Sequence, residues 1–201
     1  AFTALAVASG ADTVIAENVP NLLRMEGGLV FSAVLEEFHE RGFHYCAWRS
    51  LNARQFGLPH SRNRVFMVAS KSREACLTLF RSLPQDHVEQ KPSDVAGFYW
   101  TAGTHSICYS KGYVPAIKIG STISIPSPPA IHYHDTVRQL TATEALKLQG
   151  FNIEEFQQLS PSVIFKMAGN AVARPVGRFV VDGVLNNIVD ESFTFSASQP
   201  D

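Results

Sequence analysis

Three charged side chains in the first third of the chain have the types and spacing for acid–base and electrostatic chemistry. Glu17 follows a short apolar run at residues 13–16, and Arg62 and Arg64 alternate along a later segment. A positioned carboxyl group can share a proton with a reacting molecule, and a fixed guanidinium can stabilise negative charge as it develops. Taken alone, such groups are more often solvated surface charges, so the surrounding elements decide between the two interpretations.

The elements expected around these residues belong to an α/β sheet. The run at 13–16 predicts a buried parallel strand that ends in Glu17 and Asn18, at the edge where open α/β sheets bind ligands. Apolar residues at helical spacing predict a helix over 27–41, capped by Gly42. Residues 43–48 and 64–70 predict two more strands. This order of strand, helix, strand and strand is typical of the end of an α/β sheet with an added edge hairpin.

The second half of the chain has a different character. After a short helix near 73–83, residues 71–137 are rich in Gly, Pro, Ser and Thr, which indicates a small irregular module with a strand-like piece at 116–119. Thr141 and Glu144 form a capping-box pattern that predicts the start of a helix. Pro175 predicts the start of the last helix. Its expected buried stripe consists of Phe179, Val180, Val184, Leu185 and Ile188.

Composition excludes some classes of protein and leaves others open. The 201 residues are 45% hydrophobic and 17% charged, with a net charge of -1, as in ordinary globular proteins. No apolar run reaches the length of a membrane helix, and no signal peptide is visible. The three cysteines, Cys46, Cys76 and Cys108, form no Cys-x-x-Cys pair, which argues against a disulfide scaffold or a zinc site and favours a reducing cytoplasm. We expect no metal.

Four segments, taken in order, resemble the motifs of cytosine-5 DNA methyltransferases. They are Glu-Asn-Val-Pro at 17–20, Phe-Gly-Leu-Pro-His-Ser-Arg-Asn-Arg-Val-Phe at 56–66, Arg-Gln-Leu-Thr at 138–141 with the following Glu144 and Leu-Gln-Gly-Phe, and Gly-Asn-Ala-Val at 169–172. The irregular module lies in the gap where that family keeps its target-recognition domain. The resemblance covers about residues 3–190, and four motifs in order are far more specific than any one of them.

The resemblance implies a fold and a reaction. The fold would be α/β, a Rossmann-like S-adenosylmethionine-dependent methyltransferase with a partial sheet and a small irregular target-recognition domain. Residues 1–70 would be the C-terminal half of the catalytic domain, 71–137 the target-recognition domain, 138–191 helices that return to the catalytic domain, and 192–201 a tail. The enzyme would flip a cytosine out of double-stranded DNA and methylate carbon 5 after a cysteine has added to carbon 6.

The resemblance also assigns roles to individual residues. Glu17, Asn18, Arg62 and Arg64 would form the catalytic group. Asn170, Ala171 and Val172 would line the cofactor pocket, although Gly169 and Asn170 also fit a plain turn. The expected DNA-binding residues are His60, Lys118, Ser121, Thr122 and Arg138. Ordinary loop polarity competes with this role for Lys118, Ser121 and Thr122, and a structural ion pair competes equally for Arg138.

Two departures from the family pattern qualify these expectations. The family usually has Gln where this chain has His60. The Phe-x-Gly-x-Gly cofactor loop and the Pro-Cys-Gln nucleophile segment are also missing from these 201 residues. We expect both before Ala1 or on a partner chain, so that this chain alone is inactive.

Three settings follow from the resemblance. The first is a restriction-modification or orphan enzyme in the bacterial cytoplasm, associated with the nucleoid. The second is a non-catalytic DNA-specificity subunit of a split methyltransferase. The third is a transfer-RNA cytosine-5 methyltransferase. The reading frame upstream of Ala1 would separate the first two, and methylation of transfer RNA in place of duplex DNA would identify the third.

Overall fold

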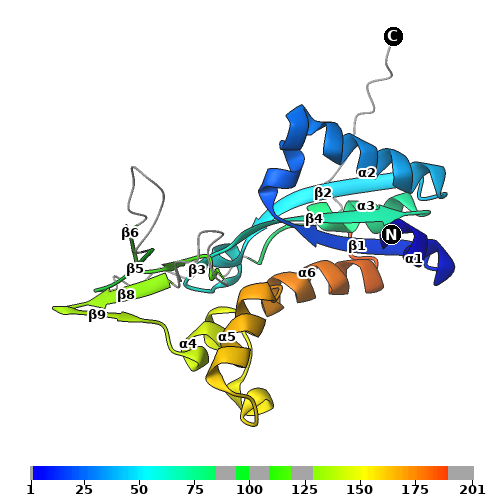
Figure 1. Cartoon of the computed structure of the whole chain (residues 1–201). Helices are drawn as coiled ribbons and strands as arrows, with labels where there is room; N and C mark the ends of the chain where they lie inside the picture. The colour runs from blue at the N-terminus through cyan, green and yellow to red at the C-terminus, as the bar shows by residue number, and fades with distance from the viewer. Residues whose placement is uncertain (1, 85–93, 100–108, 119–128, 190–201) are drawn as a thin grey trace. The chain divides into compact units, whose positions relative to one another are not determined.

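The computed structural model describes residues 2–84, 94–99, 109–118 and 129–189 (Figure 1). The chain divides into two compact units. The first comprises the described parts of Ala1–Leu51, Arg64–Leu83 and Arg178–Asp201, and the second those of Asn52–Asn63 and Pro84–Gly177. Among the described residues, none of the helices combines the length and the hydropathy that a bilayer span requires.

The first unit contains a three-stranded sheet in the order β1-β4-β2, formed by β1 (Thr13–Asn18), β4 (Asn63–Ser70) and β2 (Tyr45–Asn52). β1 and β4 are antiparallel, with a register that runs from Thr13 opposite Ser70 to Asn18 opposite Val65. This corrects the expectation of a buried parallel strand, because the pairing found for β1 is antiparallel and only its Val14 is buried. An apolar run indicates that a strand packs against a core, but it does not specify the direction of the neighbouring strand.

Two helices, α1 (Phe2–Ala8) and α2 (Leu29–Glu40), share a hydrophobic core with β1 and β4. In Figure 1, α2 runs along one face of the three strands. Its buried residues are Phe31 and Phe38, whereas Leu29 is 69% exposed. Between β1 and α2 lie η1 (Pro20–Leu23) and η2 (Met25–Gly28). Gly28 has a φ of 98°, so the helix begins after it and not at residue 27 as expected.

The last helix, α6 (Arg174–Leu185), begins close to the expected position and crosses the boundary between the two units. Phe179 and Val180 are buried as expected, but Leu185 is 76% exposed and Ile188 is 43% exposed, which corrects the expected stripe. In the first unit, the α6 segment packs near Thr78 and Arg81, which begin and follow η4 (Thr78–Phe80), the short helix after α3 (Arg73–Leu77). The Arg81 guanidinium donates to the Phe179 carbonyl and lies 4.0 Å from the centroid of its ring.

The second unit contains a four-stranded antiparallel sheet in the order β6-β5-β8-β9. Its strands are β5 (Val95–Tyr99), β6 (Tyr109–Lys111), β8 (Pro129–Tyr133) and β9 (Thr136–Gln139). The region expected to be irregular therefore has an ordered sheet, while the strand expected at 116–119 is absent from its described part, 116–118. The composition did not predict the sheet, because its strands are short and the sequence between them is rich in turn-forming residues.

A smaller sheet consists of the parallel strands β3 (His60–Ser61) and β7 (Val114–Pro115). A short helix, η3 (Ala53–Phe56), lies between β2 and β3 in the sequence. Three helices follow the sheet: α4 (Ala142–Leu148), η5 (Ile153–Phe156) and α5 (Pro161–Asn170). α4 and α5 share a hydrophobic core with β7 and β8. The capping box of α4 is confirmed, since Thr141 and Glu144 each accept from the other's backbone N–H. Sequence patterns did not predict α5.

Candidate active site

Glu17 and Arg64 form an ion pair across β1 and β4. Glu17 lies opposite Phe66 in the register, and Arg64 lies two residues from Phe66 on the same strand face. The two charged residues are therefore diagonal neighbours, a spacing that long side chains can span. Arg64 Nε lies 3.0 Å from Glu17 Oε1. These residues are 47 positions apart in the sequence, and the antiparallel pairing of β1 with β4 brings them together.

The pair is partly shielded from water and still accessible. The side chain of Glu17 is 25% exposed and that of Arg64 is 18% exposed. Partial burial lowers the effective dielectric constant and strengthens electrostatic interactions with a bound group. A carboxylate next to a guanidinium can accept hydrogen bonds from one edge of a planar polar molecule while the cation stabilises negative charge on that molecule.

Asn18 supports the turn that follows Glu17. Its Oδ1 accepts a hydrogen bond from the Val19 N–H at 2.8 Å, and Pro20 then starts η1. Pro at the first position of a helix has a fixed φ that suits the turn. The expected role of Asn18, to hold the Glu17 segment, remains a prediction with this local contact in its favour.

Arg62 and His60 lie in the second unit and are both buried, at 4% and 0% exposure. The Arg62 backbone carbonyl accepts from the Ala53 N–H at 3.0 Å. His60 Nδ1 lies 3.1 Å from the Leu148 carbonyl, and the Ile117 N–H donates to His60 Nε2 at 3.2 Å. His60 was expected to contact DNA, but it has no exposed surface and both ring nitrogens have partners inside this unit. Its geometry favours a role in packing.

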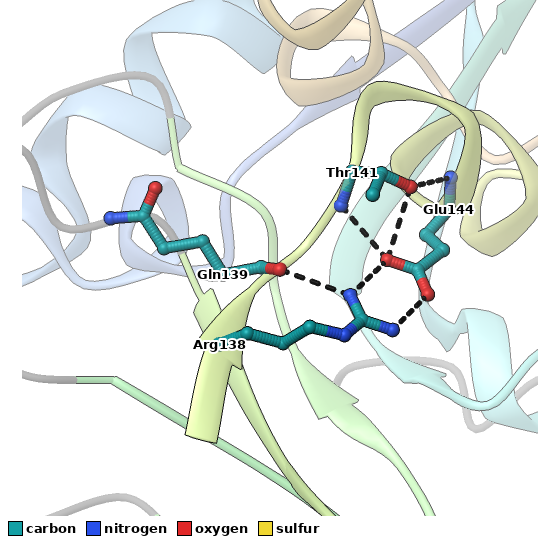
Figure 2. Close-up of polar contacts among 4 residues, drawn as sticks. All are labelled: Arg138, Gln139, Thr141 and Glu144. Atoms are coloured by element: carbon teal, nitrogen blue, oxygen red, sulfur yellow. Dashed lines mark hydrogen bonds and ion pairs between the residues drawn. The ribbon is translucent and has the colours of Figure 1, made fainter. Parts of the chain in front are cut away.

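Arg138 forms a bidentate ion pair with Glu144, shown in Figure 2. The two guanidinium nitrogens lie 2.7 and 2.8 Å from the carboxylate oxygens. The same carboxylate accepts from the Thr141 N–H at 2.8 Å and from the Thr141 hydroxyl at 3.1 Å. The hydrogen bonds from Arg138, and then those from Thr141, lower the pKa of Glu144 to about 2. Of the two roles considered for Arg138, this geometry favours the structural ion pair.

The segment expected to bind the cofactor lies at the end of α5. Asn170 is its last residue and is exposed, while Ala171 and Val172 are half-buried. The Ala171 N–H donates to the Met167 carbonyl at 2.9 Å, so it is already used to end the helix. Asn170 and Ala171 also line a cavity that is otherwise formed mainly by the apolar residues Leu146, Phe151, Phe156, Met167 and Ala168.

The remaining expected DNA contacts can be placed only in part. Lys118 Nζ lies 4.3 Å from the centroid of the Tyr99 ring, which fits a cation–π interaction. Ser121 and Thr122 lie outside the described residues. Within the described ranges there is no group of three or more His, Cys, Asp or Glu residues that could hold a metal ion.

The two described cysteines are poor candidates for a nucleophile. Burial raises the pKa of the Cys46 thiol. Burial, with a smaller contribution from Cys46, raises the pKa of Cys76 to about 11, and its thiol donates to the Tyr45 and Val68 carbonyls. A nucleophilic cysteine needs a stabilised thiolate, which neither site provides. Cys108 lies outside the described residues.

Two structural residues, Gln149 and Gln55, were given no role from the sequence, although patterns in it pointed to them. Gln149 is fully buried, and its amide N–H donates to the Ala168 carbonyl at 2.5 Å, which ties α4 to α5. A polar residue directly after the apolar face of a predicted helix was the available signal. Gln55 completes a second capping box with Asn52. The Asn-x-x-Gln spacing at 52–55 was the signal there.

Comparisons with known proteins agree on one family. The family described as C-5 cytosine-specific DNA methylase matches residues 6–111. The Type II methyltransferase M2.BsuMI of Bacillus subtilis is 35% identical over 185 residues, which cover 83% of this chain and 46% of that protein. The Type II methyltransferase M.Bsp6I of a Bacillus species is 24% identical over 218 residues, covering 92% of this chain and 69% of the relative. The chain thus spans about half the length of M2.BsuMI.

The fold agrees with that of a solved methyltransferase. The crystal structure of S. pombe Dnmt2 methyltransferase superposes with a TM-score of 0.61 at 14% identity, over 88% of this chain and 65% of that one. The match supports a methyltransferase fold with mixed α/β content. With the sequence match over more than half of its residues, this chain belongs to the C-5 cytosine-specific DNA methylase family.

Proposed function

We propose that these residues are part of a DNA cytosine-5 methyltransferase of the restriction-modification type, which acts on double-stranded DNA in the bacterial cytoplasm. The observation that carries the proposal is the half-buried Glu17–Arg64 pair, 3.0 Å apart on neighbouring strands. The resemblance implies that both residues belong to the family's catalytic motifs. Membership of the family supports the reaction class, and the pair supplies the polar groups that this reaction requires.

The chemistry explains the need for both charges. When a thiolate adds to carbon 6 of a flipped cytosine, negative charge develops on the N3 and O2 side of the ring. Glu17 shares a proton with N3 and accepts a hydrogen bond from the exocyclic amine, which relieves that charge. Arg64 holds the Glu17 carboxylate in place and stabilises the charge at O2. The activated carbon 5 then takes the methyl group and loses its proton to a base, while the thiolate leaves carbon 6 and the double bond of the ring is restored.

S-adenosylmethionine, the cofactor expected for this family, supplies the electrophilic methyl group when bound. The described residues fit part of such a molecule. The exposed Asn170 amide can hydrogen-bond its amino-acid end, and the neighbouring apolar cavity offers packing for a non-polar portion. Ala171 contributes its surface and not its N–H, which the helix end uses. Val172 completes the segment.

The nucleophile, in this proposal, comes from residues outside these 201. The sequence contains no Pro-Cys pair, and the raised pKa values of Cys46 and Cys76 oppose thiolate formation at both. The chain's share of the reaction is therefore to polarise the base and to position the DNA. A polypeptide that carries the glycine loop and the nucleophile would complete the site.

The four-stranded sheet of the second unit is the proposed target-recognition module. Its strands follow the Arg62–Arg64 motif in the sequence, and the last of them, β9, contains Arg138. Lys118 lies over the ring of Tyr99, the last residue of β5, and Ser121 and Thr122 follow Lys118 in the sequence. Lysine, serine and threonine side chains commonly contact phosphates and base edges. Arg138 supports the module through Glu144 and does not itself read bases.

The test compares Glu17→Gln and Arg64→Gln in the methyltransferase that contains this chain, with methyl transfer to unmethylated DNA as the readout. Glu17→Gln should lower kcat/KM by about 100-fold or more, the size of a lost acid–base contribution. Arg64→Gln should cost a similar factor. A matched control is Asp12→Asn, because the Asp12–Lys71 pair joins the other end of the same two strands at 2.8 Å. The proposal fails if Glu17→Gln and Asp12→Asn have the same activity.

A further inference from the structure

His60 is the fully buried imidazole at the start of the segment that carries the two arginines. It belongs to β3, which pairs with β7 through His60 opposite Val114. Its Nδ1 lies 3.1 Å from the Leu148 carbonyl at the end of α4, and its Nε2 lies 3.2 Å from the Ile117 backbone nitrogen. One side chain therefore joins three segments that are far apart in the sequence, and all three belong to the second unit.

These contacts determine which ring nitrogen carries the proton. The Ile117 N–H can only donate, so His60 Nε2 must accept with its lone pair. The Leu148 carbonyl can only accept, so Nδ1 must carry the hydrogen. The ring is therefore neutral, with its proton on Nδ1. Leu148 is the last residue of α4, where carbonyl groups lack partners in the helix and favour an outside donor.

Segment 116–118, which His60 contacts, contains Lys118 and precedes Ser121 and Thr122, the other proposed recognition residues. Ile117 is 2% exposed, and its two neighbours in the sequence also make tertiary contacts. The Tyr99 hydroxyl donates to the Ala116 carbonyl, and Lys118 Nζ lies over the Tyr99 ring. Arg62 follows His60 by two residues, and the Arg62 N–H donates to the His60 carbonyl at 3.0 Å. His60 thus links the recognition segment 116–118 to the start of the arginine segment.

We propose that His60 is a positioning residue that holds segment 116–118 in register with residues 60–62, and so contributes to target discrimination. The inference rests on the proposed function. What the site requires is a neutral side chain with one donor and one acceptor on the same planar group. A glutamine amide has the same pair, so glutamine can replace His60 at this position without loss of either hydrogen bond.

The test uses His60→Gln and His60→Leu in the methyltransferase that contains this chain, with exposed His44→Leu as the control. Unmethylated plasmid DNA is the substrate, and bisulfite sequencing gives the methylation rate at every cytosine. His60→Leu leaves a buried N–H and a buried carbonyl without their partner, so it should lower the ratio of target to other methylation by about tenfold. His60→Gln should restore the ratio to within about twofold, a rescue that a space-filling role would not give.

A second measurement keeps the inference testable if His60→Leu does not fold. Nitrogen NMR of the histidine-labelled wild-type protein, with the His60 signals assigned by their loss in His60→Gln, should show a protonated Nδ1 and an accepting Nε2. The opposite tautomer or a charged ring would overturn the inference, as would full discrimination in a folded His60→Leu. If the wild-type enzyme methylates no cytosine, the proposed function fails instead, while the NMR result still stands on its own.

Discussion

The Arg138–Glu144 pair gives a prediction whose size can be worked from the structure. The pKa of Glu144 falls from 4.5 to about 2, chiefly through the Arg138 hydrogen bonds. Without solvent screening, a shift of this size corresponds to roughly 3 kcal/mol of stability, at about 1.4 kcal/mol for each tenfold change in acidity. The side chains are 47% and 34% exposed, so solvent screening reduces this to about 1 kcal/mol.

The perturbation is a double-mutant cycle of Arg138→Gln, Glu144→Gln and the double variant. Glutamine at 144 can keep the capping box with Thr141, so the cycle isolates the ion pair from the cap. Hydrogen exchange of peptides that cover α4 measures the local free energy of opening. We expect a coupling of about 1 kcal/mol near neutral pH.

Acidification should remove this coupling in a defined direction. The folded state depresses the pKa of Glu144, so the unfolded state binds a proton first as the pH falls. The contribution is therefore fully present above the ordinary pKa of 4.5 and is lost as the pH falls from there toward 2. A coupling near zero at neutral pH, or one that grows on acidification, would refute the structural role. Arg138→Gln should also leave the salt dependence of DNA binding unchanged, whereas a lost phosphate contact would reduce its slope.

Four further predictions concern the cysteines and the packing of the second unit. Cys76 should react with iodoacetamide far more slowly than a free thiol at mildly alkaline pH, because burial raises its pKa to about 11, and Cys46→Ser should retain full methyl transfer. Gly97→Ala should lower the free energy of unfolding by about 1–3 kcal/mol in urea titrations, since an added Cβ would lie 2.6 Å from the Val114 Cα. Gln149→Leu leaves the Ala168 carbonyl without its donor, so we expect a loss of about 1–3 kcal/mol in the same titration.

Local patterns predicted the elements that depend on local physics. The capping box of Thr141 and Glu144 was confirmed, because its hydrogen bonds form between residues three apart. The start of α6 near Pro175 follows from the same kind of rule. Errors occurred where the outcome depended on distant packing. Leu185 and Ile188 continue the helical apolar pattern, but they remain exposed in the described structure.

In the candidate site, too, the sequence indicated which residues take part but not the contacts between them. The resemblance selected Glu17 and Arg64, while the antiparallel pairing of β1 and β4 brought them to 3.0 Å from each other. For His60 the sequence indicated only a departure from the family's usual residue. Its burial and its two partners, Leu148 and Ile117, depend on three segments that no local pattern connects.

The central claim is that this chain polarises the base while the nucleophile comes from elsewhere, and covalent trapping tests it most directly. The methyltransferase that contains this chain would be incubated with S-adenosylmethionine and duplex DNA containing 5-fluorocytosine, and peptide mass spectrometry would locate the adduct. We predict an adduct on a cysteine outside these 201 residues, much reduced in Glu17→Gln. An adduct on Cys46, Cys76 or Cys108, or one undiminished in Glu17→Gln, would contradict the account.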